Sequence, residues 1–308
     1  MLSAYKNTAY VLLGGALCKA WQLIFSCFSL CALVKRCFNL KINATRDCGP
    51  DSINFLDPSY IDVGKKHLGD APGKVHQELE DMVLKGTDIL DGVAIQDDWF
   101  PEINADIFIS HSHGDCDLAN GIAGWMNEEF GLRCFIDSNV WGYTNDLLRI
   151  LNDKYSDKRK GDDGGIVYTH EKCNRAANHV NTMLTIALQK MIDRCECVLF
   201  LNTDQSILPY EKTLRDATDS PWIYSEIVCT QLIRHKELKE YRKEIFHGDQ
   251  RVLFEASESL RPAYPVSLDH LMPLDIGNLM KWEQSYRKAT SKKHYPLDYL
   301  YQQFPVRD

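Results

Sequence analysis

The feature that most constrains the fold is an alternation of short apolar runs with longer amphipathic segments, which starts at Ala105. The run 105–110 is apolar throughout its centre, as a strand buried on both faces of a sheet must be. The predicted strands are 105–110, 132–137, 197–201 and 251–256, and the predicted helices are 117–130, 180–194 and 222–234. Strands and helices of these lengths in alternation predict an α/β fold with a five-stranded, mainly parallel sheet that begins near Asp106.

The chain divides into two regions at about residue 100. Residues 1–100 are predicted to form an N-terminal helical region, with helices at 60–68 and 75–84, that packs on the sheet. Residues 101–308 carry the alternating pattern and a helix at 144–155. An insertion at about 156–178 is rich in Gly and charge and is expected to form an ordered loop or flap. Two more helices, at 276–287 and 295–304, form a C-terminal extension.

The stretch Tyr10–Val34 is the one membrane candidate. Its apolar character is interrupted by Lys19, Gln22 and the pair Gly14–Gly15, and we expect a helix buried against protein rather than a membrane span. A membrane anchor remains the alternative. We therefore expect a cytoplasmic protein.

Charge and cysteine content exclude several classes of function. The net charge is −8, which argues against a nucleic-acid binder, since phosphate contacts need clustered basic side chains. The 11 cysteines contain no CxxC pair, so we expect no structural metal and interpret most of them as small core residues. Near the expected crevice, Cys116 and Cys134 belong to no recognisable Cys/His/Asn pattern, and we do not expect a thiol nucleophile.

Four segments should meet beyond the carboxyl ends of the strands, where ligands bind in doubly wound sheets. They are 111–115, 138–144, 203–220 and the start of the helix at 222. Ser220 and Pro221 mark that helix start as an N-cap and a first helical position. Trp222 and Glu226 are four residues apart and lie on one helical face, where an indole and a carboxylate could hold a ring beside a developing cation. The alternative is a core tryptophan with a glutamate in a surface ion pair.

Three segments resemble TIR domains. The run 106–115 (DIFISHSHGD) is similar to their first strand and the loop after it, and 134–137 (CFID) to their second strand. The run 220–227 (SPWIYSEI) resembles the TIR helix whose glutamate is catalytic in NAD-cleaving members, with Trp222 at the aromatic position. The resemblance covers about 105–256, is strongest to bacterial TIR-like proteins of anti-phage systems such as Thoeris, and implies a flavodoxin-like fold. Residues 1–100 and the 156–178 insertion are not part of a minimal TIR domain.

The resemblance implies an enzyme that cleaves the nicotinamide–ribose bond of NAD, with NAD as substrate and no cofactor or metal. Its product would be an ADP-ribose-derived signal, a cyclic isomer or a conjugate, that activates a downstream effector in anti-phage defence. Glu226 is the expected catalytic residue. The expected substrate-binding residues are Trp222, His111, Ser112, His113, Ser138 and Trp141.

Several alternatives stay open at this point. His111 and His113 could instead be loop and capping residues, and Trp141 could pack against the N-terminal region rather than cover a nucleotide. A non-enzymatic scaffold that acts through TIR–TIR contacts is the alternative function, and a membrane-tethered sensor is a third.

Overall fold

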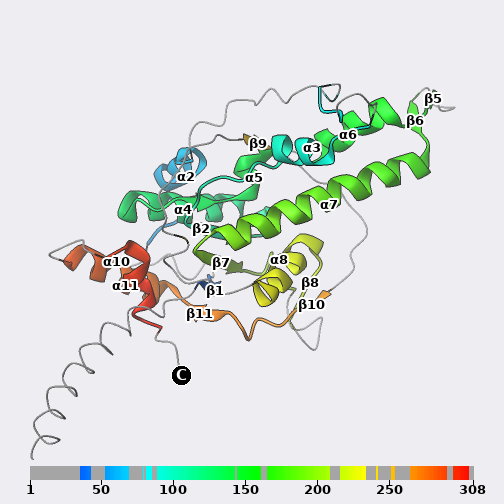
Figure 1. Ribbon diagram of the computed structural model, residues 1–308. Coiled ribbons are helices and arrows are strands. Elements are labelled where there is room, and N and C mark those ends of the chain that lie inside the picture. The colour runs from blue at the N-terminus through cyan, green and yellow to red at the C-terminus, as the bar shows by residue number, and fades with distance from the viewer. Residues whose placement is uncertain are drawn as a thin grey trace, which may run out of the picture. The chain divides into compact units, whose positions relative to one another are not determined.

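The computed structural model describes most of the chain after Val34 (Figure 1). The described residues are 35–42, 53–68, 79, 81–84, 89–142, 144–160, 165–208, 216–233, 241, 251–253, 264–289 and 294–304. The chain divides into two compact units, of which the larger comprises Arg36–Arg234 and Ile245–Asp308. The fold and the site below belong to this larger unit. The predicted helix in Tyr10–Val34 lies outside the described residues, and so does most of the one predicted at 75–84.

A parallel five-stranded sheet forms the centre of the larger unit. Its strands stand in the order β11-β1-β7-β2-β3, and every neighbouring pair is parallel. Their bounds are Arg36–Lys41 for β1, Ile107–Ser110 for β2, Cys134–Phe135 for β3, Cys197–Asn202 for β7 and Met272–Leu274 for β11. The prediction of an α/β fold with a mainly parallel five-stranded sheet is confirmed, and this arrangement is compatible with a flavodoxin-like fold.

One strand of the sheet comes from an unexpected part of the chain. The sheet does not begin near Asp106, because β1 lies within the region that the sequence predicted to be helical and stands between β7 and β11. The predicted strand 251–256 is not part of this sheet. Its described residues form β9 (Arg251–Leu253), which pairs with β4 (Trp141–Gly142) instead.

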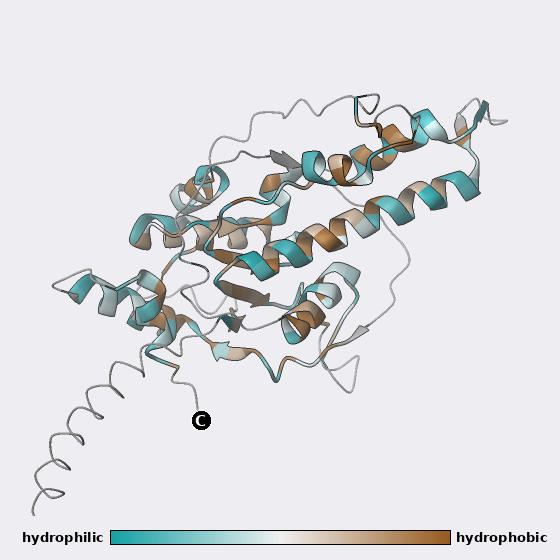
Figure 2. Ribbon diagram, in the orientation of Figure 1, coloured by the Kyte–Doolittle hydropathy of each residue, from teal (hydrophilic) through white to brown (hydrophobic). Residues whose placement is uncertain are grey.

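Helices α7 (His170–Arg194) and α8 (Pro221–Leu232) cover one face of the sheet, and α3 (Gly92–Trp99) and α6 (Thr144–Tyr155) pack against α7. Their apolar side chains share one buried cluster with Phe108 and Val198, which are register partners in β2 and β7. Figure 2 shows the mixed character of α7, whose hydrophobic residues alternate with hydrophilic ones along the helix. Helices α6, α7 and α8 correspond to those predicted at 144–155, 180–194 and 222–234, whereas α3 was not predicted.

The opposite face is covered by α4 (Cys116–Phe130), α10 (Ile276–Lys288) and α11 (Pro296–Tyr301). Neighbouring side chains of a strand point to opposite faces, so Phe38 of β1 lies on this side, where its ring stacks on Tyr301. The rings of Phe130 and Trp282 stack with centroids 4.0 Å apart and join α4 to α10. The two predicted C-terminal helices are confirmed in place by α10 and α11.

Helix α2 (Pro58–Lys66) packs on the outside of α4 at very short range. A Cβ on Gly121 would lie 1.6 Å from the carbonyl oxygen of Phe55, and one on Gly64 would lie 1.8 Å from that of Asn120. Only glycine permits such an approach of two backbones. The predicted helix at 60–68 is confirmed as α2, but it packs on α4 and not directly on the sheet.

The insertion is more regular than the sequence indicated. Residues 158–160 and 166–168 form an antiparallel hairpin of β5 and β6, and α7 starts at His170 rather than at Val180.

Two other predicted elements also differ in the structure. Residues 81–84 form a turn and an isolated bridge between Val83 and Leu90 rather than the end of a helix. The predicted strand 132–137 is only two residues long, because α5 (Asp137–Val140) follows it directly. Strand β8 (Ala217–Thr218) precedes α8 and strand β10 (Tyr264–Pro265) follows it, and the two form a short antiparallel pair.

None of the helices in the described residues has the length and apolar character needed to cross a bilayer.

Candidate functional site

The candidate site lies where the strand order reverses. The chain leaves β2, passes through α4 to β3 on one side, and then returns through α7 to β7 on the other side of β2. Helices that leave neighbouring strands in opposite directions open a crevice beyond the carboxyl ends of those strands. The segments after β2 and β7 are therefore the ones placed to bind a ligand.

Glu226 reaches this place from α8 and contacts the end of β2. The helix starts as the sequence predicted, because the Ser220 side chain accepts a hydrogen bond from the Ile223 N–H and Pro221 occupies the first turn. The hydroxyl of Ser110, the last residue of β2, donates to Glu226 Oε2 at 2.5 Å. Both side chains are buried, with exposed fractions of 3% for Ser110 and 6% for Glu226. The interpretation of Glu226 as a surface ion-pair residue is therefore wrong.

Burial changes the acidity of this carboxyl group. Loss of water around Glu226 raises its pKa, the negative charge of Asp137 raises it further, and the Ser110 hydrogen bond and His111 lower it, with a result of about 8. At neutral pH the carboxyl group of Glu226 is therefore largely protonated. A cation bound beside it would favour the ionised form, because opposite charges at close range stabilise each other in a buried environment.

A second group of side chains surrounds His111, the residue after Ser110. His111 Nε2 lies 3.7 Å from the sulfur of Cys116 and 3.5 Å from the hydroxyl oxygen of Ser138. Its other ring nitrogen, Nδ1, lies 3.3 Å from the carbonyl oxygen of Ile109 and 3.9 Å from Asp137 Oδ1. These groups come from three places in the fold: the end of β2, the first residue of α4 and the start of α5.

The imidazole of His111 favours the charged form in this setting. Burial by itself lowers the pKa, since only 4% of the side chain is exposed. The hydrogen bond with Cys116 and the charge of Asp137 outweigh burial and raise the pKa of His111 to about 9. Glu226, His111 and Asp137 thus form one electrostatic cluster, in which Asp137 acts on both of the other groups.

Asp115 holds the loop after β2 in place. Its Oδ2 accepts hydrogen bonds from the hydroxyls of Ser112 at 2.6 Å, Thr203 at 2.6 Å and Ser206 at 3.3 Å. Asp115 occupies the N-cap position of α4, but its side chain makes no capping hydrogen bond there. It ties the β2 loop to the segment after β7, and so fixes the loop that carries His111 and Cys116.

The structure brings together only some of the residues that the sequence singled out. Glu226, His111 and Ser138 lie in the cluster just described. Ser112 instead faces Asp115, and His113 is exposed in the short 3-10 helix at His113–Asp115.

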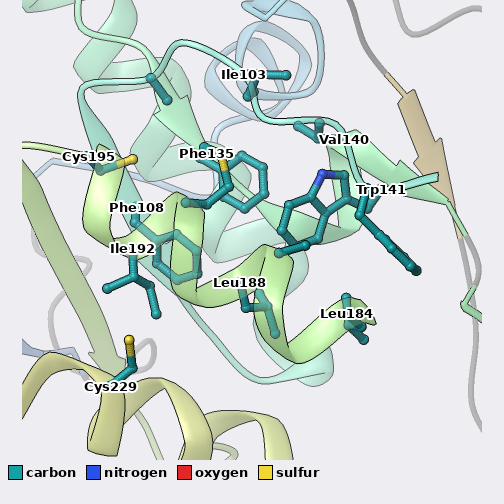
Figure 3. Close-up of a cluster of buried hydrophobic side chains, with 14 of the residues drawn as sticks. Ile103, Phe108, Phe135, Val140, Trp141, Leu184, Leu188, Ile192, Cys195 and Cys229 are labelled. Carbon is teal, nitrogen blue, oxygen red and sulfur yellow. The ribbon is translucent and has the colours of Figure 1, made fainter. Parts of the chain in front are cut away.

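The two predicted aromatic residues do not lie freely over the site. Trp222 is half-buried and packs against the core cluster, one turn before Glu226. Trp141 is 3% exposed, donates its indole N–H to the carbonyl oxygen of Pro101 at 3.0 Å, and packs edge-on against Phe135 in the cluster of Figure 3. The prediction of Trp141 as a substrate-binding residue therefore conflicts with its place in the core.

Two residues of the site, Ser110 and Asp137, escaped the sequence analysis, and Cys116 was placed near the crevice without its histidine partner. Ser110 was read as part of a buried strand, and Asp137 as the end of the next one. Cys116 was noted, but its contact with His111 spans a loop that tertiary hydrogen bonds shape. Among the described residues there is no group of three or more His, Cys, Asp or Glu side chains arranged to hold a metal ion.

Fold and site together define an α/β protein with a buried, protonatable carboxyl group at the switch point of a parallel sheet. Comparison with known proteins found no matching family model, no significantly similar curated protein and no significantly similar solved structure.

Proposed function

We propose that the protein is a TIR-like enzyme that cleaves the bond between nicotinamide and ribose in NAD, with Glu226 as the catalytic residue. The observation that carries the proposal is the position of Glu226: a buried carboxyl group, oriented by the Ser110 hydroxyl, at the crevice where a parallel sheet binds ligands. The resemblance of 106–115, 134–137 and 220–227 to TIR segments supports the same assignment.

Cleavage of the nicotinamide–ribose bond requires a negative charge beside the ribose more than it requires proton transfer. Nicotinamide in NAD already carries a positive charge and leaves as a neutral molecule, so the leaving group needs little help from an acid. The enzyme must stabilise a ribose that becomes an oxocarbenium-like cation, and a fixed carboxylate beside it does so. Substrate binding would itself promote this state, because the cationic ring favours ionisation of Glu226, whose pKa is about 8.

Other parts of the site would bind the rest of the nucleotide. Helix α4 begins directly after the β2 loop, and the N–H groups of its first turn are suited to a phosphate group. Trp222 precedes Glu226 by one turn and has one part of its side chain accessible for contact with a ring. Trp141 has no part in this proposal, because it belongs to the core.

We further propose that the product is an ADP-ribose-derived signal, either a cyclic isomer or a conjugate, that activates a separate effector in anti-phage defence. Exclusion of water from the crevice would let a second nucleophile capture the ribosyl cation in place of hydrolysis. Self-association through TIR contacts would complete the active assembly.

The test is NAD cleavage by the purified full-length protein, with the products identified by mass spectrometry. Glu226→Gln keeps the shape of the side chain and removes its charge, and it should lower the rate by at least about a hundredfold, the effect of deleting one preorganised electrostatic group. Tyr224→Phe is the matched control: Tyr224 lies on the same helix but is 38% exposed, and its substitution should leave the rate within about twofold.

The assay needs conditions in which the wild type cleaves NAD, with a trigger or partner if one is required. Cleavage by Glu226→Gln at the wild-type rate would refute the catalytic role of Glu226. Absence of cleavage by the wild type under all conditions, together with NAD-independent self-association, would favour a scaffold that acts through TIR–TIR contacts.

A further inference from the structure

The contacts of Cys116 set it apart from the other half-buried cysteine of the described residues. Cys116 is the first residue of α4, and its sulfur lies 3.7 Å from His111 Nε2 and 3.9 Å from the Ser138 hydroxyl. Cys173 is also half-buried and also lies in the first turn of a helix, and its sulfur is 3.8 Å from the Ser156 hydroxyl. The difference between the two thiols is the histidine.

The surroundings of His111 decide which of its nitrogens carries a proton. Nδ1 faces two acceptors, the carbonyl oxygen of Ile109 and the carboxylate of Asp137, so Nδ1 holds the ring proton in the neutral form. Nε2 is then the nitrogen that can accept a proton, and it is the one that faces Cys116. This order of thiol, imidazole and carboxylate is the arrangement in which a histidine serves as base for a nucleophile and an acid orients the histidine.

The thiol is connected to the candidate catalytic carboxyl group through His111 and Asp137. His111 follows Ser110 in the chain, and Ser110 is hydrogen-bonded to Glu226. Asp137, which contacts His111, also acts electrostatically on Glu226. His111 and Asp137 therefore interact electrostatically with Glu226, and Cys116, which contacts His111, remains partly accessible to solvent.

We propose that Cys116 is a nucleophilic thiol, with His111 as its base and Asp137 as the residue that positions His111, and that it captures the ribosyl group released at Glu226. This part of the mechanism rests on the proposed function. The bond between the anomeric carbon and the nicotinamide nitrogen breaks, and nicotinamide leaves with the bonding electron pair. In the pair of Cys116 and the charged His111 ring, the thiol proton has already passed to His111 Nε2. The Cys116 sulfur then forms a bond to the anomeric carbon, and no further proton transfer is needed.

The activation of the thiol is tested without NAD. The folded protein is treated briefly with iodoacetamide at neutral pH, and alkylation of Cys116 and Cys173 is followed by peptide mass spectrometry. Cys116 should react at least about tenfold faster than Cys173, since a paired histidine increases the thiolate fraction of a cysteine. His111→Gln should reduce the rate at Cys116 to that of Cys173 and leave Cys173 unchanged.

Equal rates at the two cysteines of the wild type, or a rate at Cys116 that does not depend on His111, would overturn the activated thiol. Circular dichroism of His111→Gln establishes that the variant is folded. If it is not, His111→Asn and the wild-type ratio of the two rates decide the question.

Capture of the ribosyl group is tested by incubation with NAD, acid quenching and peptide mass spectrometry. The expected result is an ADP-ribosyl adduct on Cys116 and none on Cys173, with no adduct at position 116 in Cys116→Ala. Nicotinamide release without any adduct would overturn the capture step and leave the proposed function standing. Absence of both nicotinamide and adduct would overturn the proposed function and the capture step, while the alkylation ratio would still decide whether the thiol is activated.

Discussion

Substitution of Glu226 by glutamine should stabilise the protein more at alkaline than at acidic pH. The pKa of the Glu226 carboxyl group is about 8 in the folded protein and 4.5 for an unperturbed glutamate. Between these two values the folded state binds more protons than the unfolded state, so the free energy of unfolding falls as the pH rises. The loss starts above pH 4.5 and is complete above pH 8. Glutamine does not titrate and avoids this loss.

The size of the effect follows from the same two values. One pKa unit corresponds to 1.36 kcal/mol. Between pH 5.5 and pH 8.5 the wild type should therefore lose about 3 kcal/mol relative to Glu226→Gln. The Ser110 hydroxyl can still donate to the amide oxygen, so that hydrogen bond is retained in the variant. His111 titrates in both proteins, and its contribution largely cancels in the comparison.

Urea unfolding of both proteins at the two pH values measures the difference directly. Glu171→Gln is the control, because Glu171 is 83% exposed at the start of α7 and its ion pair with Arg175 is a surface one. This variant should stay within about 0.5 kcal/mol of the wild type at both pH values. A difference between Glu226→Gln and the wild type that is the same at pH 5.5 and pH 8.5 would refute the argument, since it would mean that folding does not desolvate the carboxyl group.

Three further predictions follow from the packing and the site. Gly121→Ala should lower the thermal unfolding midpoint and the free energy of unfolding, the latter by about 1–3 kcal/mol, because the new Cβ would meet the Phe55 carbonyl oxygen. Gly92→Ala is the control and should leave the midpoint unchanged, because the atom nearest to its new Cβ would be 3.5 Å away. Asp115→Ala removes the acceptor of three hydroxyls, and should cost about 1–3 kcal/mol and speed hydrogen exchange at 112–116, measured by mass spectrometry. Finally, kcat/KM for NAD cleavage should rise with pH, reach half of its maximum near pH 8 and level off above it, because that ratio reports ionisation of the free enzyme.

Each of these has an outcome that would contradict it. Equal midpoints for Gly121→Ala and the wild type would show that α2 and α4 can separate without loss. Unchanged exchange at 112–116 in Asp115→Ala would show that the loop does not depend on the buried carboxylate. A kcat/KM that is constant from pH 6 to pH 9 would mean that Glu226 is already ionised in the free enzyme.

The helices were predictable because their signals are local. Helix α4 ends at Gly131, whose φ of 66° is the left-handed conformation that favours glycine. Helix α8 begins at the Ser220 cap with Pro221 in its first turn. Spacing on α8 placed Trp222 and Glu226 on one face, and the resemblance of 220–227 to the TIR helix selected Glu226 as the catalytic residue. These features need no knowledge of distant residues.

Strand β1 was not predictable in this way. Its sequence, RCFNLK, includes the charged Arg36 and the polar Asn39, both of them buried, so it lacks the continuous apolar run typical of a central parallel strand. The Arg36 guanidinium is satisfied by the carbonyl oxygens of Tyr301 and Phe304, at the far end of the chain. A residue whose partners lie that far away cannot be assigned from its neighbours in sequence.

The residues of the site also differ in how far they could be predicted from local sequence. Glu226 lies in one recognisable helix segment, whereas the contacts among His111, Cys116 and Asp137 depend on how three separate elements are arranged in space. Trp141 was misplaced for a related reason: its indole N–H finds an acceptor in Pro101, which makes full burial favourable. Nothing in the residues around position 141 indicates that acceptor.

The central position of β1 has a consequence for how the chain folds during synthesis. Arg36 pairs with Cys197, and Phe38 pairs with Met272, so both neighbours of this strand leave the ribosome long after it. Until they do, β1 has two unpaired edges, which are prone to pair with other chains. Closing such long loops also makes folding slow. Residues 36–41 can therefore take their place in the sheet only after both neighbouring strands have been synthesised, so the centre of this sheet forms late.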